Sequence, residues 1–268
     1  MSLIGVFDSG VGGLSILDEA LRQLPQNDYI YLADSANAPY GEKSPDWIAQ
    51  RSLNLCKHLA EAGCDAIVVA CNTATAEAIK DIRAAIPIPI VGVEPGIKPA
   101  AMQSVNGIVG VLATEATLNS DKFNALLSTL PSHCQFIKQA GAGLVPLIEA
   151  GKANDGETLE LLAKHLEPIQ VAGSDTIVLG CTHYPFLRKA IRKLLGDKIT
   201  LIDTSEAVVK QLKRQLEVLA LNQADSANDD SSEYGAVHFF SSKDEQALLK
   251  MAQDLMHTDL KNHRVSTA

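Results

Sequence analysis

Eight short apolar segments constrain the fold of this chain more than any other feature of its sequence. They are three to five residues long, and some, such as Ala66–Ala70, have no polar position. Such a segment is typical of a parallel strand that helices cover on both faces. The predicted strands are Leu3–Phe7, Tyr29–Ala33, Ala66–Ala70, Ile90–Val93, Ile108–Leu112, Ile177–Leu179, Ile199–Ile202 and Val237–Phe240.

Amphipathic stretches lie between these segments. Ser44, Pro45 and Asp46 form a typical helix start, with a cap residue, a proline in the first turn and an acid near the positive end of the helix dipole. Pro25, Gly63 and Gly196 follow helical patterns and end them. We expect helices over 14–24, 45–62, 187–195 and about 244–256. Alternating strands and helices predict an α/β protein with mainly parallel sheets.

Two segments depart from this alternation. Residues 222–235 are rich in Asn, Asp and Ser, which predicts a long polar loop or an acidic surface excursion. Residues 262–268 have no periodic pattern, and we expect a loose tail there.

Composition and charge narrow the class of protein. Apolar residues make up 46% of the chain, as in an ordinary globular protein, and no run is long enough to span a membrane. The net charge is −9 and no basic stripe offsets it, so we expect neither a nucleic-acid nor a membrane partner. The N-terminus has no secretory pattern, and the five cysteines are scattered without a C-x-x-C pair. These features predict a cytoplasmic protein without a disulfide framework or zinc site.

The chain also resembles itself. Asp65–Thr73 aligns with Asp175–His183, 110 residues later, and Ile4–Ser9 aligns with Val109–Thr114, 105 residues later. Two similar offsets in the same order predict two related α/β units. The alternative is that buried strands look alike because Val and Ile dominate all of them.

The repeat places Cys71 and Cys181 at equivalent positions, each where a buried strand ends and a helix is expected to begin. Ligands bind at this edge of open α/β sheets. The positive end of a helix dipole is expected to lower a thiol pKa toward neutrality. Two facing thiols suit the inversion of a stereocentre, because one removes a proton from one face and the other returns a proton to the opposite face. The alternative, two buried structural cysteines, is the reading that we give to Cys56, Cys64 and Cys134.

Asp8, at the end of the first strand, and His183, two residues after Cys181, could help to ionise a thiol or balance a substrate charge. A capping aspartate and a satisfied interior histidine are the plainer readings. The glycine-rich stretch from Gly10 to Ser15 has Ser15 where a G-x-G-x-x-G motif needs glycine. Asp34 lies where a ribose-binding acid would fall, so a nicotinamide enzyme is a competing hypothesis. We favour glycines that admit a substrate carboxylate to backbone N–H groups.

Six motifs together resemble the glutamate racemases of the cofactor-independent aspartate/glutamate racemase superfamily. They run along nearly the whole chain: Gly5–Leu14, Asp34-Ser35 with Pro39–Gly41, Val69–Ala74, Gly92–Gly96, Gly110–Thr114 and Leu179–Pro185. The resemblance implies two pseudo-symmetric α/β domains facing across a central cleft, 1–95 plus 210–268 and 96–209. It also implies a homodimer in the cytoplasm that supplies D-glutamate for peptidoglycan and uses no cofactor or metal.

The resemblance also implies roles for individual residues. Cys71 would take the α-proton of D-glutamate with help from Asp8, and Cys181 that of L-glutamate with help from His183. Glu149 would line the pocket, although a solvated helix acid is the plainer reading. The substrate-binding set would be Asp8, Ser9, Tyr40, Gly41, Asn72, Thr73, Thr114, Thr117, Glu149, Thr182 and His183. Thr114 and Thr117 could equally be ordinary helix-cap residues. The competing functions are an aspartate racemase and a non-catalytic amino-acid-binding protein.

Overall fold

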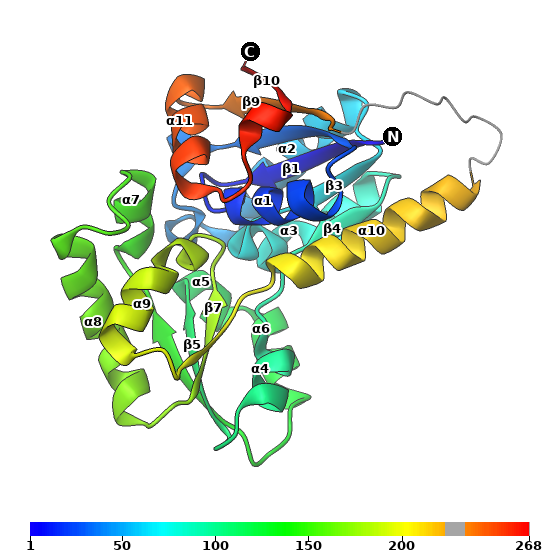
Figure 1. Cartoon of the computed structure of the whole chain (residues 1–268). Helices are drawn as coiled ribbons and strands as arrows, with labels where there is room; N and C mark the ends of the chain where they lie inside the picture. The colour runs from blue at the N-terminus through cyan, green and yellow to red at the C-terminus, as the bar shows by residue number, and fades with distance from the viewer. Residues whose placement is uncertain (223–233, 268) are drawn as a thin grey trace.

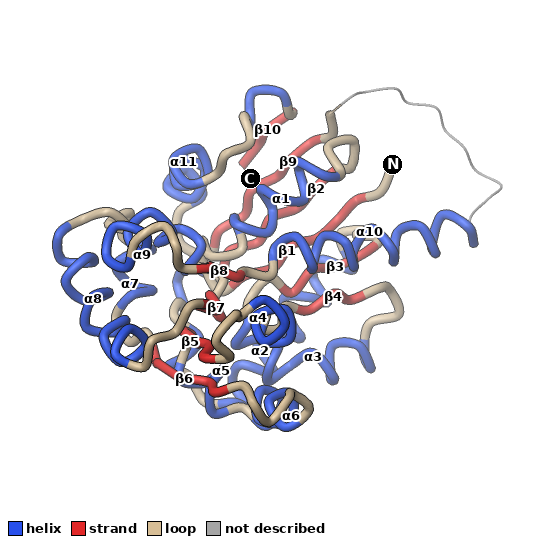
Figure 2. Tube along the Cα trace, turned by 60° about the horizontal axis from the view of Figure 1, so that its bottom comes forward, coloured by secondary structure: helices blue, strands red, loops and turns tan. Residues whose placement is uncertain are grey.

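A computed structural model describes residues 1–222 and 234–267 of the chain. Its strands form two parallel sheets, one in each half of the molecule (Figures 1 and 2). The first sheet has the order β10-β9-β2-β1-β3-β4, formed by β1 (Leu3–Asp8), β2 (Asp28–Ala33), β3 (Ala66–Val69), β4 (Ile90–Gly92), β9 (Ala236–Ser241) and β10 (Arg264–Thr267). The second has the order β6-β5-β7-β8, formed by β5 (Ile108–Ala113), β6 (Gln135–Ala140), β7 (Thr176–Gly180) and β8 (Thr200–Ile202). We call each sheet with its helices the first and the second unit.

Helices cover both faces of each sheet, which is why the strands carry apolar residues on both faces. In the first unit these are α1 (Leu14–Gln23), α2 (Pro45–Glu61), α3 (Asn72–Ala85), α10 (Ser205–Asn222) and α11 (Glu245–Leu255). In the second they are α4 (Ile97–Gln103), α5 (Glu115–Asn119), α6 (Asp121–Ser128), α7 (Leu144–Glu149), α8 (Gly156–Val171) and α9 (Arg188–Leu195). Short 3₁₀ turns occupy Ser35–Asn37, Tyr40–Glu42, Tyr184–Leu187 and Leu260–Asn262. The mixed α/β class and the two-unit architecture are confirmed.

The sheet orders agree with the internal repeat. Strands β2-β1-β3-β4 of the first unit and β6-β5-β7-β8 of the second have the same order and are all parallel. β1 therefore corresponds to β5, and β3 to β7, as the two sequence offsets predict. The two aspartates of the repeat make similar hydrogen bonds. The Asp65 carboxylate accepts the Leu3 N–H at 2.8 Å, and the Asp175 carboxylate accepts the Asn106 N–H at 2.8 Å. Each anchors the backbone near the start of the neighbouring strand of its sheet, β1 or β5.

Two details differ from the sequence-based expectations. The loose tail predicted over 262–268 is wrong, because Arg264–Thr267 pairs in parallel with β9, and His263 before it is buried. The edge strand β6 was missed, because Gln135–Ala140 is neither a continuous apolar run nor a regular alternation of polar and apolar residues. The polar loop predicted over 222–235 falls mostly outside the described residues.

Candidate functional site

The carboxyl ends of the two sheets face each other, and the candidate residues lie between them. Thr73 Oγ1, after β3, is 3.0 Å from Thr114 Oγ1, after β5. The Val11 N–H, after β1, donates to Glu149 of α7 at 2.8 Å. All strands of a parallel sheet have their carboxyl ends on the same side. Two sheets whose carboxyl ends face each other therefore bring their strand-end loops together.

Cys71 lies at the end of β3 and caps α3. Its sulfur accepts the Ala74 N–H at 3.5 Å and is 3.5 Å from Ser9 Oγ. Asp8 is completely buried; its Oδ2 accepts the Gly10 N–H at 2.9 Å, whereas Oδ1 has no hydrogen-bond partner among the described residues. A buried carboxylate oxygen without a partner is costly unless a ligand supplies one.

The expected lowering of the Cys71 pKa is wrong for this structure. Burial, and after it the negative charge of Asp8, raise the pKa of the Cys71 thiol to about 12, against the smaller effects of the Ala74 N–H and the Ser9 hydroxyl. Cys71 does lie at a helix N-terminus as predicted, but the effect of desolvation on its pKa outweighs the effect of the helix dipole. Burial also raises the pKa of Asp8, although His183 opposes that shift. Cys71 is therefore a protonated thiol at neutral pH in this structure.

Cys181 has a different environment. Its sulfur is 3.7 Å from His183 Nδ1, and His183 Nε2 is 2.6 Å from Glu149 Oε1. Burial alone would lower the pKa of His183, but its hydrogen bonds with Cys181 and Glu149 outweigh burial and raise the pKa well above its ordinary value. A protonated His183 places a positive charge beside the sulfur of Cys181. Cys181 precedes a 3₁₀ turn and not a long helix. The electrostatic environment of its sulfur is therefore set by neighbouring side chains more than by a helix dipole.

The glycine-rich loop after β1 packs directly on these groups. A Cβ atom at Gly12 would overlap the His183 ring and lie 2.7 Å from Thr182 Oγ1, and one at Gly10 would overlap the Glu149 carboxylate. Glycine is thus required here because the loop approaches the opposite unit closely.

Hydroxyl groups gather on the side of the site next to Cys71. Thr114 caps α5, since its Oγ1 accepts the Thr117 N–H at 3.2 Å, and it also bonds Thr117 Oγ1 at 2.8 Å. The helix-cap reading is therefore confirmed for Thr114, which in addition reaches Thr73 across the units. Asn72 donates to the Val93 carbonyl at 3.4 Å. Gly41 approaches Thr114 from the first unit, with 3.4 Å between its ideal Cβ position and Thr114 Cβ.

The loop that carries Tyr40 and Gly41 is held by a network around Asp34. The buried Asp34 carboxylate accepts two bonds from Arg51, at 2.8 and 2.7 Å, one from Tyr40 at 2.7 Å and two from Asn37. Burial would raise the pKa of Asp34, but these donors lower it to about 2. An acid satisfied in this way is not free to bind a ribose, which argues against the nicotinamide hypothesis. Arg51 was missed in the sequence, because its partner Asp34 lies 17 positions earlier and no local pattern marks the pair.

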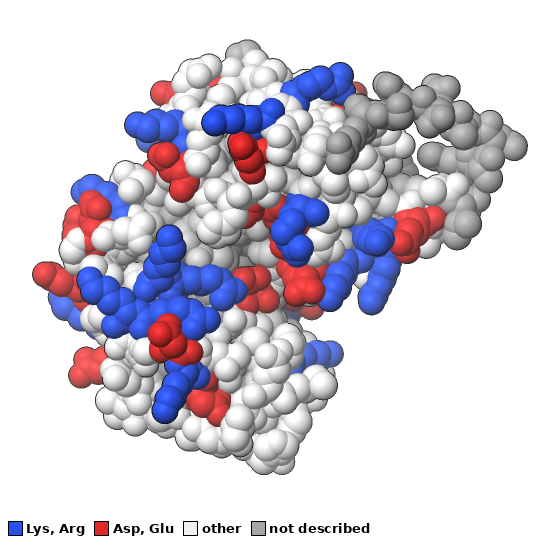
Figure 3. Space-filling view, in the orientation of Figure 1, with Lys and Arg blue, Asp and Glu red and all other residues white. Residues whose placement is uncertain are grey.

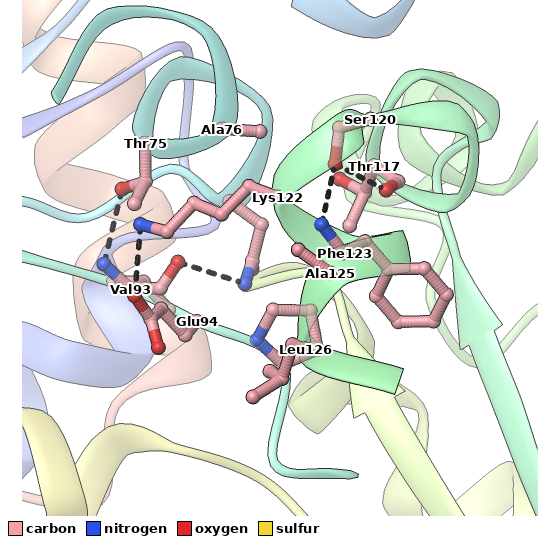
Figure 4. A pocket seen from close by; sticks show the side chains of 12 residues that line it. Thr75, Ala76, Val93, Glu94, Thr117, Ser120, Lys122, Phe123, Ala125 and Leu126 are labelled. Atoms are coloured by element: carbon pink, nitrogen blue, oxygen red, sulfur yellow. Dashed lines mark hydrogen bonds and ion pairs between the residues drawn. The ribbon is translucent and has the colours of Figure 1, made fainter. Parts of the chain in front are cut away.

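The candidate polar residues are nearly closed off from solvent, with Cys71 5% and Cys181 6% exposed. A pocket of about 280 Å³ lies beside them, between α3 and α6 (Figure 4). Its lining includes Asn72 and Thr117 but neither cysteine, and an ion pair of 2.8 Å between Lys122 and Glu94 crosses its edge. Both thiols are therefore almost completely buried in this structure.

All five cysteines lie in the described part of the chain and are free thiols. Cys56 and Cys64 are core residues as expected, and Cys134 is half-buried. Over residues 1–222 and 234–267, no cluster of three or more His, Cys, Asp or Glu side chains is arranged to hold a metal ion. Within the same ranges, no helix combines the length and apolar character that crossing a membrane requires.

One expectation about surface charge is corrected. Lys and Arg side chains gather in a patch over α9, whose sequence contributes Arg188, Lys189, Arg192 and Lys193 (Figure 3). Arg188 is paired with Asp203, and Arg192 lies 3.7 Å from Asp197. A basic surface therefore exists locally on an acidic protein; helical spacing on a short segment creates it. The expectation of no nucleic-acid partner stays a prediction.

Comparisons with known proteins agree with this geometry. The family model for Asp/Glu/hydantoin racemases matches residues 4–212. A glutamate racemase of Cupriavidus pinatubonensis is 47% identical over 263 residues, 98% of this chain and 94% of the relative, and one of Ralstonia pickettii is 51% identical over 224 residues, 84% and 79%. The crystal structure of Escherichia coli glutamate racemase with L-glutamate and the activator UDP-MurNAc-Ala superposes with a TM-score of 0.84 at 33% identity, over 99% of this chain and 97% of that one. With matched thiols at equivalent strand ends and relatives this similar over nearly its whole length, the chain belongs to the Asp/Glu/hydantoin racemase family and groups with its glutamate racemases.

Proposed function

We propose that this chain interconverts L-glutamate and D-glutamate by a two-thiol acid/base mechanism that needs no cofactor. The observation that carries the proposal is the placement of Cys71 and Cys181 at the ends of the equivalent strands β3 and β7, in units whose strand-end loops touch. A racemase must treat mirror-image substrates alike, and a two-fold repeat supplies like groups on opposite faces of one carbon.

In the L-to-D direction, the Cys181 thiolate takes the α-proton of L-glutamate. The Cα–H bond breaks as an S–H bond forms, and the electron pair stays at Cα. The Cys71 thiol then gives its proton to the opposite face of Cα, which leaves Cys71 as a thiolate and Cys181 as a thiol. The return direction reverses both transfers. A protonated Cys71, as its high pKa favours, is the state that turns over the L isomer.

The auxiliary residues divide between the two thiols. His183 assists Cys181, because its Nδ1 lies beside that sulfur, and Glu149 holds the ring through Nε2. Asp8 assists Cys71 by accepting or returning the thiol proton, and its unpartnered Oδ1 offers an acceptor to the substrate ammonium group. The groups proposed to hold the substrate are those of Ser9, Tyr40, Gly41, Asn72, Thr73, Thr114, Thr117 and Thr182.

Three further proposals rest on the family. The enzyme supplies D-glutamate for peptidoglycan synthesis and shape maintenance of the cell, it acts in the cytoplasm, and it forms a homodimer. We also propose the domain division 1–95 plus 210–268 and 96–209. The two sheets support it, because β9 and β10 join the sheet of the first unit while β5–β8 form the other.

The test is turnover of glutamate in D₂O by exhaustively dialysed protein. We expect deuterium at Cα of both isomers together with racemisation. A protein that binds glutamate without incorporating deuterium would be a binding protein, and racemisation that vanishes on dialysis and returns with pyridoxal phosphate would contradict the cofactor-free mechanism. Aspartate is the second candidate substrate, because the family description includes it; a panel of diacids separates the two.

A further inference from the structure

We propose that Ser15 is a positioning residue for the Cys181 half of the site, through a hydrogen bond from the first unit to the backbone of the second; the inference rests on the proposed function. Ser15 is the residue that breaks the dinucleotide-type glycine motif. It lies in the first turn of α1, and its Oγ is 3.0 Å from the Thr182 carbonyl oxygen.

The Thr182 carbonyl needs this donor because of the local sequence. In the turn after β7, the Cys181 carbonyl accepts the Tyr184 N–H at 3.0 Å, and the His183 carbonyl accepts the Phe186 N–H at 3.2 Å. Each bond joins a residue to the third one after it, as in a 3₁₀ turn. For Thr182 the third residue is Pro185, which has no N–H.

Ser15 supplies the missing donor from the other unit. Its single hydroxyl proton is shared with the Gly12 carbonyl, which lies 2.8 Å from the hydroxyl oxygen and also accepts the Ser15 backbone N–H at 3.1 Å. Removing the hydroxyl therefore leaves the Gly12 carbonyl with a hydrogen-bond donor, whereas the Thr182 carbonyl loses the donor that Ser15 supplies.

This bond holds the part of the backbone that orients the catalytic groups. The Thr182 carbonyl belongs to the peptide plane that joins Thr182 to His183, so its direction fixes where the His183 side chain leaves the backbone. The His183 ring lies against Gly12 and beside the Cys181 sulfur, where small rotations change its alignment. Ser15 acts on the reaction only through this turn, since no contact joins its hydroxyl to either sulfur among the described residues.

Ser15→Thr and Ser15→Val test the inference, because threonine and valine have the same shape and only threonine keeps the hydroxyl. The readout is chloride release from β-chloro analogues of L- and D-glutamate, which requires deprotonation by one thiol only. We expect Ser15→Val to lower release from the L analogue, through Cys181, about tenfold. Release from the D analogue, through Cys71, should stay within about twofold, and Ser15→Thr should resemble the wild type.

The rescue variant is Pro185→Ala, which restores an N–H three residues after Thr182. Added to Ser15→Val, it should recover most of the lost release from the L analogue. Ser128→Ala is the matched control, because Ser128 of α6 donates only to the carbonyl three residues before it, at 2.7 Å, and should change neither analogue.

The inference is overturned if Ser15→Val leaves both analogues unchanged, if it lowers both equally, or if Pro185→Ala fails to rescue it. Should Ser15→Val fail to fold, the double variant with Pro185→Ala decides, since it must then fold and release chloride from both analogues. Failure of the proposed function is a separate result: the wild-type protein would not racemise glutamate in D₂O.

Discussion

Replacing Glu149 by Gln isolates the charge that acts on His183. Glutamine has nearly the same size and keeps an oxygen that can accept the Val11 N–H, so the contact between the units is retained. The variant loses the carboxylate that lies 2.6 Å from His183 Nε2.

The size of the effect follows from burial. Only 3% of the His183 side chain and 17% of the Glu149 side chain are exposed, so solvent screens the pair weakly. A hydrogen bond to a charged group contributes about 1.5–3 kcal/mol, against about 0.5–1.5 kcal/mol for a neutral one. The difference of roughly 1 to 1.5 kcal/mol corresponds to about a tenfold change in rate.

We therefore expect Glu149→Gln to lower the pKa of His183. Chloride release from the L analogue should fall about tenfold, and the alkaline limb of its pH–rate profile should move to lower pH. The assay is a pH–rate profile for each analogue, with Glu157→Gln as the control, because the exposed Glu157 pairs with Lys152 and with no other charged residue in the described part of the chain. An unmoved alkaline limb, or an equal fall for the D analogue, would refute this account of the pair.

The same pair gives a stability signature. A raised histidine pKa stabilises the folded state fully below the unfolded pKa, and this stabilisation is lost as the pH rises through the folded pKa. Glu149→Gln should therefore lower the free energy of unfolding by about 1 kcal/mol at pH 6 and progressively less at alkaline pH. Urea unfolding at pH 6 and at alkaline pH measures the free energy of unfolding of the variant and the wild type. A difference between them that grows with pH would contradict this account.

Three further predictions concern other parts of the site. Cys71→Ser and Cys181→Ser should each abolish racemisation, because a hydroxyl is a far weaker acid than a thiol. Cys71→Ser should keep chloride release from the L analogue, and Cys181→Ser should keep it from the D analogue. If both variants lost release from both analogues equally, the two-thiol mechanism would be contradicted. Gly12→Ala should lower racemisation at least tenfold and the free energy of unfolding by about 1–3 kcal/mol, because its methyl group overlaps the His183 ring. Gly156→Ala, whose methyl group enters open space, should leave activity unchanged. Turnover and thermal unfolding of the two variants measure this. Asp34→Asn should lower the free energy of unfolding by about 2–3 kcal/mol at pH 7, measured by urea unfolding. Because the folded pKa of Asp34 is about 2, the wild type loses this stabilisation as the pH falls from about 4 toward 2, and a deficit that persists unchanged at pH 2 would contradict the ion pair.

Much of the site could be predicted because its residues follow recognisable strands. Cys71, Asp8 and Cys181 each come at the end of an apolar segment or directly after it, and parallel strands carry such residues to one edge of a sheet. The repeat offsets then predicted that the strands β3 and β7 correspond, and the sheet orders agree. No comparable local pattern marks Arg51, whose partner Asp34 lies 17 positions earlier in the sequence.

The sequence by itself determined the α/β class, the two related units and the pair of thiols, because apolar periodicity and strand-end chemistry are local properties of the chain. Only the tertiary structure decided how the two thiols differ. Cys71 is buried beside Asp8, which keeps it protonated, whereas Cys181 lies beside a histidine that Glu149 charges from another helix. A thiol pKa depends on desolvation and on charges within a few ångströms, and folding brings those groups together from positions far apart in the sequence.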